Sequence, residues 1–127
     1  MRSVLWGLSA ALLLPATGLA ADWHCRNPDL EILCDRGKCS ASETFTPLDI
    51  RLDAHGTLSV CAYSGCWDGA AQIFRAGDHL FASGRGLTRS SAPEDRKDFM
   101  LGIDTEDALG HLQGAGFSLP VTCVSAP

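Results

Sequence analysis

Short runs in which hydrophobic and polar residues alternate recur along the chain. In the first clear run, Leu48, Ile50 and Leu52 alternate with polar residues. Similar runs follow at 58–62, 67–73, 80–84, 99–103 and 117–123. Successive side chains of a strand point to opposite faces, so these runs predict strands with one buried and one solvent-facing side.

Turn-forming sequences separate the runs, for example at 53–56 and 75–78. Many short strands divided by turns predict an all-β fold, a small antiparallel β-barrel or sandwich of about seven to eight strands. A weaker run at 109–113 is assigned to a hairpin strand, in preference to a short helix over 104–112, which its pattern also fits.

The longest segment without alternation is 88–98. It contains Ser90, Ser91, Pro93 and a dense group of charged residues. This composition predicts an exposed, mobile loop between the strands at 80–84 and 99–103.

The first twenty residues have the features of an export signal. Arg2 precedes an apolar run at 4–14, and the small residues Gly18 and Ala20 follow it. The run is too short for a membrane span. The sequence therefore predicts a signal peptide over 1–20, a single domain over 21–127 without a membrane anchor, and a periplasmic or secreted location.

Six cysteines follow the predicted signal, an even number that predicts three disulfides in an oxidising compartment. Two pairs have Cys-x4-Cys spacing, typical of cysteines that face each other across a hairpin, and the remaining two would join the chain ends. The predicted bridges, from among 15 possible connectivities, are Cys34–Cys39, Cys61–Cys66 and Cys25–Cys123. The Cys-x2-Cys spacing of zinc sites and the Cys-x-x-Cys motif of thiol oxidoreductases do not occur.

The charge of the chain limits its partners. After the predicted cleavage, nine basic side chains face fifteen acidic ones, a formal net charge of −6. This balance argues against nucleic acid and anionic membranes as partners. No metal-ligand spacing or nucleophile motif stands out, so we expect neither a cofactor nor a metal, and we assign no catalytic residue.

Two regions are candidates for binding. Tyr63 lies at the tip of the proposed Cys61–Cys66 hairpin, where an aromatic side chain can anchor a partner; Trp67 is expected to pack inward. The segment 83–98 gathers positive charge on an acidic protein, with Arg85 and Arg89 as the proposed contacts.

The sequence Ser83-Gly84-Arg85-Gly86-Leu87 is similar to the Ser-Gly-x-x-Tyr loop of the periplasmic c-type lysozyme inhibitors. Members of that family are small exported antiparallel β-barrels that plug an enzyme cleft. Leu87 stands where the family has Tyr, and the second family motif, which ends in Thr-Lys-Gly, is absent. The resemblance implies a binding role for Ser83, Gly84 and Arg85.

These observations favour a small exported, non-enzymatic binding module that acts on an extracytoplasmic protein, as an inhibitor or protective partner of an enzyme. Two alternatives stay open at this point. The chain is a small-ligand carrier if the barrel interior contains a cavity, and an enzyme if it has an active site without a recognisable motif.

Overall fold

The computed structural model describes residues 21–28, 30–42 and 44–126. The predicted signal peptide over 1–20 lies outside these residues. The described chain forms ten strands: β1 (Asp22–Arg26), β2 (Ile32–Asp35), β3 (Lys38–Ala41), β4 (Asp49–Leu52), β5 (Thr57–Ala62), β6 (Gly65–Ala76), β7 (His79–Arg89), β8 (Ala92–Asp104), β9 (Leu109–Gly114) and β10 (Phe117–Ala126). Within those ranges, no helix is long and apolar enough to cross a membrane.

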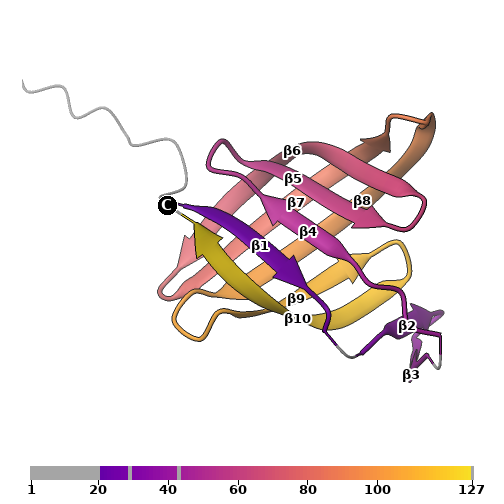
Figure 1. The fold of residues 1–127 in the computed structure, drawn as a ribbon, viewed down its shortest axis with the longest axis horizontal. Coiled ribbons are helices and arrows are strands. Elements are labelled where there is room, and N and C mark those ends of the chain that lie inside the picture. Colours follow the sequence, from indigo (N-terminus) through magenta and orange to yellow (C-terminus); the bar gives the residue numbers. More distant parts are fainter. Residues whose placement is uncertain (1–20, 29, 43, 127) are drawn as a thin grey trace, which may run out of the picture.

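Eight of the strands close into an antiparallel barrel, which confirms the predicted all-β class (Figure 1). The order around the wall is β1-β4-β5-β6-β7-β8-β9-β10, and pairing of β10 with β1 completes the circle. The β2–β3 hairpin lies outside this circle and joins it where Leu33 of β2 pairs with Phe117 of β10.

The barrel interior is filled by the hydrophobic residues of the alternating runs. Leu52, Leu58, Leu80 and Leu112 are among the fully buried side chains, and Trp23 and Trp67 are each 8 % exposed. Burying a side chain of this size contributes about 1.5–3 kcal/mol. These residues form one continuous core that occupies the space a ligand-carrying barrel would leave open.

A disulfide spans the seam at which the barrel closes. Cys25 of β1 and Cys123 of β10 are directly opposed in the register and both are buried. The other two bridges, Cys34–Cys39 and Cys61–Cys66, each join opposed residues of a hairpin. All three predicted pairings are confirmed, and they fit an oxidising, extracytoplasmic environment.

The prediction of a mobile loop over 88–98 is wrong. Strands β7 and β8 continue through this segment, paired from Leu87–Lys97 to Arg89–Ala92, with only Ser90 and Ser91 in the turn. Alternation fails here because the hairpin runs past the packed core, so neither face of β8 between 93 and 98 needs hydrophobic residues. A register shift between Gly84 and Leu87 turns Leu87 back into the core.

The two ends of the barrel differ (Figure 1). One end, here called the hairpin end, carries the β5–β6, β7–β8 and β9–β10 turns and the β2–β3 hairpin. The opposite end carries the β4–β5, β6–β7 and β8–β9 turns, together with both termini of the described barrel. The hairpin end therefore combines two disulfide-closed hairpins with the long β7–β8 hairpin.

Candidate functional site at the hairpin end and front wall

The structure separates the residues of the lysozyme-inhibitor-like segment. Ser83 and Arg85 are exposed on β7, whereas Gly84 is buried in the barrel wall. A Cβ at position 84 would lie about 3.0–3.1 Å from methyl carbons of Leu87 and Leu58. Gly84 therefore makes room for core side chains, and only its two exposed neighbours are accessible to a partner.

Arg89 is a bracing residue rather than a free loop cation. Its side chain is only 14 % exposed, and its guanidinium carbon lies 4.6 Å from the centroid of the Trp67 ring. Nη2 donates a hydrogen bond of 2.9 Å to Ser64 Oγ, and Nη1 lies 3.6 Å from Asp95 Oδ2. These contacts connect the β7–β8 hairpin to the β5–β6 turn and hold both in place.

Tyr63 stands at the tip of the β5–β6 turn and is 78 % exposed. The Cys61–Cys66 disulfide closes the turn beneath it. Its hydroxyl donates a hydrogen bond of 3.4 Å to the carbonyl oxygen of Phe45, in the connection before β4. The structure thus brings Tyr63 and the Arg89 brace together at one end of the barrel, while Ser83 lies on the wall.

Two buried polar residues position the connection that carries Phe45. Asn27 donates a hydrogen bond to the carbonyl oxygen of Thr46 at 3.0 Å and accepts one from the Leu48 amide at 2.8 Å. The Glu31 carboxylate accepts a hydrogen bond from the Thr46 amide. Because these bonds hold the backbone directly after Phe45, they help to position the carbonyl group that accepts the hydrogen bond from Tyr63.

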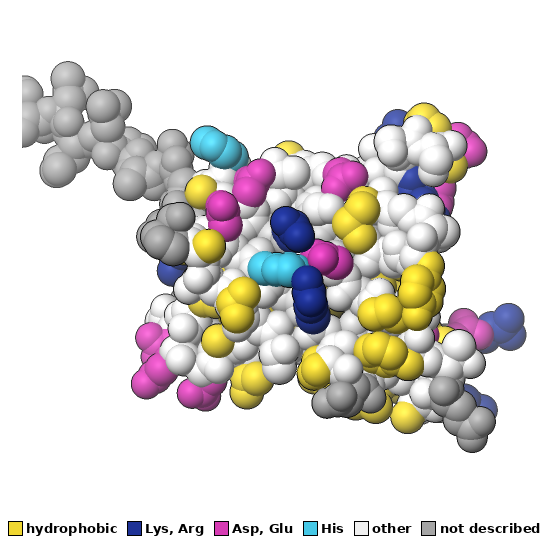
Figure 2. All heavy atoms as spheres, in the orientation of Figure 1, with side chains coloured by type: hydrophobic (Ala, Val, Ile, Leu, Met, Phe, Trp, Pro, Cys, Tyr) yellow, Lys and Arg dark blue, Asp and Glu magenta, His cyan; other side chains and the backbone are white. Residues whose placement is uncertain are grey.

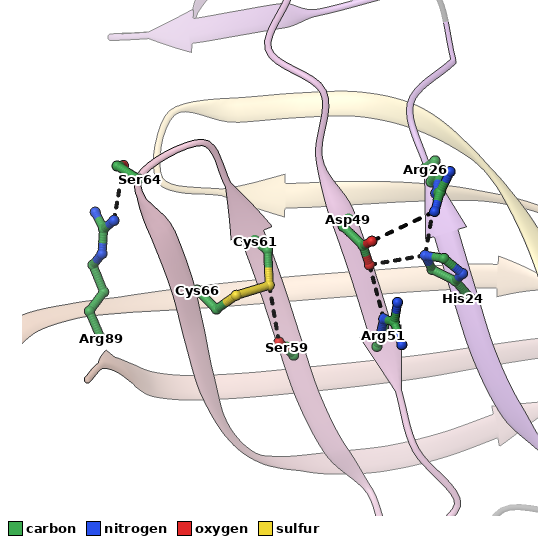
Figure 3. The surroundings of a disulfide bond; sticks show 9 residues. All are labelled: His24, Arg26, Asp49, Arg51, Ser59, Cys61, Ser64, Cys66 and Arg89. Atoms are coloured by element: carbon green, nitrogen blue, oxygen red, sulfur yellow. Dashed lines mark hydrogen bonds and ion pairs between the residues drawn. A yellow bond between two sulfur atoms is a disulfide. The ribbon is translucent and has the colours of Figure 1, made fainter. Parts of the chain in front are cut away.

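A second group of polar residues lies on the outer wall beside the β5–β6 hairpin (Figures 2 and 3). We call it the front-wall cluster: His24 and Arg26 on β1, and Asp49 and Arg51 on β4. Asp49 Oδ1 lies 2.9 Å from His24 Nε2 and accepts a 3.1 Å hydrogen bond from Arg51 Nε. Arg26 Nη2 is 3.8 Å from Asp49 Oδ2.

The electrostatics of the cluster follow from these contacts. Burial by itself would raise the pKa of Asp49, but the hydrogen bond from Arg51 and the nearby charges of His24 and Arg51 outweigh it and lower the pKa below its usual value. Asp49 is therefore ionised and faces two guanidinium groups. The cluster carries a surplus of positive charge on an otherwise acidic molecule.

Sequence reasoning missed this cluster. The alternation around β4 does predict that Asp49 and Arg51 face outward. The sequence does not show that β1 is the partner of β4, because the β2–β3 hairpin lies between these two strands in the chain. The register of the β1–β4 pair puts His24 opposite Arg51 and Arg26 opposite Asp49.

Cys61 connects the two parts of the site. It is the register partner of Asp49, so the Cys61–Cys66 bridge lies between the front-wall cluster and the Ser64–Arg89 contact (Figure 3). The candidate site is therefore a continuous surface from the exposed aromatic tip at Tyr63 to the basic group on β1 and β4. It presents an exposed aromatic side chain beside a group of cations.

Comparisons of the chain with protein family models, with curated proteins and with solved structures found no match.

Proposed function

We propose that the protein is an exported, non-enzymatic binding module that contacts an extracytoplasmic protein, as an inhibitor or protective partner of an enzyme. The proposed contact surface is the hairpin end around Tyr63, together with the adjoining front wall. The observation that carries the proposal is a large aromatic side chain that is exposed and yet held on a rigid support.

Rigidity matters for binding because ordering a loop at an interface costs affinity. Here the Cys61–Cys66 bridge and the Arg89 brace fix the support of Tyr63 before any partner arrives. An exposed tyrosine on such a support has the character of a binding hot spot. The exposed Arg85 on the neighbouring hairpin adds a peripheral cation.

The carrier alternative receives no support from the interior of the barrel. A carrier needs a pocket lined by side chains, whereas the inward positions of this barrel are occupied by packed leucine, isoleucine, valine and tryptophan residues. We therefore assign function to the outer surface.

Affinity capture with matched variants tests the proposal. The mature chain 21–127 is immobilised and exposed to an envelope extract, in parallel with Tyr63→Ala and Phe74→Ala. Phe74 is a fair control because it is also an exposed aromatic residue, at 64 %, but lies on the barrel wall toward the opposite end. We expect one specific protein to be retained by the wild type and by Phe74→Ala, and to be lost with Tyr63→Ala.

Retention of the same protein by all three forms would show that Tyr63 is not a contact, and would overturn the proposed surface. Absence of specific retention by the wild type would overturn the binding role in that extract. An inhibitory role requires in addition that the captured enzyme loses activity when the wild-type protein is added.

A further inference from the structure

One cation of the front-wall cluster has most of its hydrogen-bonding capacity left. Asp49 Oδ1 is within hydrogen-bond distance of Arg51 and His24, but Arg26 approaches Oδ2 only to 3.8 Å, beyond that distance. A guanidinium has five N–H donors. Arg26 directs its Nε toward His24 Nε2 at 3.3 Å, and its side chain is 65 % exposed. It can therefore donate to a further group.

A hollow of about 380 Å³ adjoins Arg26 where β1 meets β10. Its lining residues are uncharged or basic: His24, Arg26, Thr122, Cys123 and Val124. The Val124 side chain is well exposed, so the hollow combines a basic rim with an apolar wall.

We propose that this hollow receives a carboxylate side chain, glutamate or aspartate, of the partner protein, with Arg26 pairing with the carboxylate and Val124 contacting the methylene carbons. The inference rests on the proposed function, because it specifies the chemistry of the partner at the same surface. Hydrogen-bonded pairs between arginine and carboxylate are shorter and stronger than neutral ones.

Charge complementarity favours an acidic group at this place. With a formal charge of −6 after the predicted cleavage, the molecule as a whole repels acidic partners. In the front-wall cluster the local charge is positive, because Arg26 and Arg51 face the single carboxylate of Asp49 (Figure 3). A partner that presents a carboxylate is thereby directed to one orientation.

The shape of the site favours a side chain over a free anion. A free phosphate or sulfate gains little from the apolar wall at Val124, whereas the stem of a glutamate has carbon atoms to place there. The hollow also lies on the outer wall, where a segment of another protein can reach it.

Titration of the ¹⁵N-labelled mature protein with an oligoglutamate peptide, followed by NMR, tests the inference without the natural partner. We expect amide shifts at Arg26, Thr122 and Val124. Arg26→Ala should weaken binding about tenfold. Arg51→Ala is the matched control: it removes the same charge from the same cluster but does not line the hollow, and it should weaken binding by less than about threefold.

Equal weakening by the two variants would show that the peptide is attracted by the positive charge of the cluster in general. No weakening by either variant would show that Arg26 does not bind the carboxylate. Both results overturn the inference. Equal binding of oligoglutamine, or shifts at the hollow with inorganic phosphate and none with oligoglutamate, would overturn it as well. If capture of a protein depends on Tyr63 but the titration shows no binding at the hollow, the inference of an acidic partner group is wrong and the proposed function stands.

Discussion

Asn27 shows how a single buried amide organises two connections of the chain. Its side chain donates to the carbonyl oxygens of Leu30 and Thr46 and accepts from the amide of Leu48. Asn27 is 2 % exposed, so water cannot replace these bonds. A buried backbone group that loses its partner costs about 1–3 kcal/mol.

We therefore predict that Asn27→Ala lowers the free energy of unfolding by about 2–3 kcal/mol. Urea unfolding of the oxidised protein, followed by tryptophan fluorescence, measures the change. Gln113→Ala is the control, since it removes an exposed amide from β9 and should change stability by less than about 0.5 kcal/mol. Equal midpoints for Asn27→Ala and the wild type would show that the Asn27 bonds do not stabilise the fold.

The β7–β8 hairpin is the element in which sequence and structure differ most. The sequence predicts that Arg89 lies in an exposed, mobile loop and contacts a partner. In the structure, Arg89 stacks on Trp67 and bonds to Ser64, while Asp98 Oδ1 accepts a hydrogen bond from the Gly86 amide. Arg89 therefore ties the hairpin to β6 and the β5–β6 turn, and the bond between Asp98 and Gly86 joins its two strands.

Arg89→Ala should lower the free energy of unfolding by about 1–2 kcal/mol, the sum of a cation–π contact and a hydrogen bond. It should also speed amide hydrogen exchange in residues 86–96. Arg89→Lys, which keeps the charge but loses the planar group, should show an intermediate effect. Arg85→Ala is the matched control on the same strand; because Arg85 is exposed, its loss should leave both measurements nearly unchanged. Equal effects of Arg85→Ala and Arg89→Ala would argue against the brace.

At the scale of the whole molecule, the disulfide across the closing seam joins residues 98 positions apart, whereas the two hairpin bridges join residues 5 apart. In the chain-entropy model, a bridge restricts the unfolded chain more when it closes a longer loop. The seam bridge therefore stabilises the barrel as a whole, and each hairpin bridge mainly stabilises its own turn.

The double variant Cys25→Ala/Cys123→Ala should lose about 4–5 kcal/mol, and Cys34→Ala/Cys39→Ala about 2 kcal/mol, according to that model. Denaturant unfolding without reductant, so that the remaining disulfides stay intact, measures both losses of unfolding free energy. A loss at the β2–β3 hairpin that equals or exceeds the loss at the seam would contradict the entropic ranking.

The all-β class, most of the strands and the disulfide pairing can be predicted from the amino-acid sequence alone. Alternation identifies strands such as β4 and β5 because one face of a barrel wall is buried and the other is wet. The Cys-x4-Cys spacing identifies the two hairpin bridges because opposed residues of a hairpin lie within disulfide distance. These features are local, or follow from pairing between neighbours in the sequence.

Which side chains lie next to one another on the surface depends instead on the three-dimensional fold. The extension of β7 and β8 through 88–98 carries no alternation, since the hairpin leaves the core and both of its faces are largely exposed. The front-wall cluster depends on β1 pairing with β4. The burial of Arg89 depends on the inward-facing Trp67 beneath it. The β1–β4 contact joins strands that are distant in the sequence. The register shifts in the β6–β7 and β7–β8 hairpins change which side chains face the core, and local alternation does not show where such shifts fall.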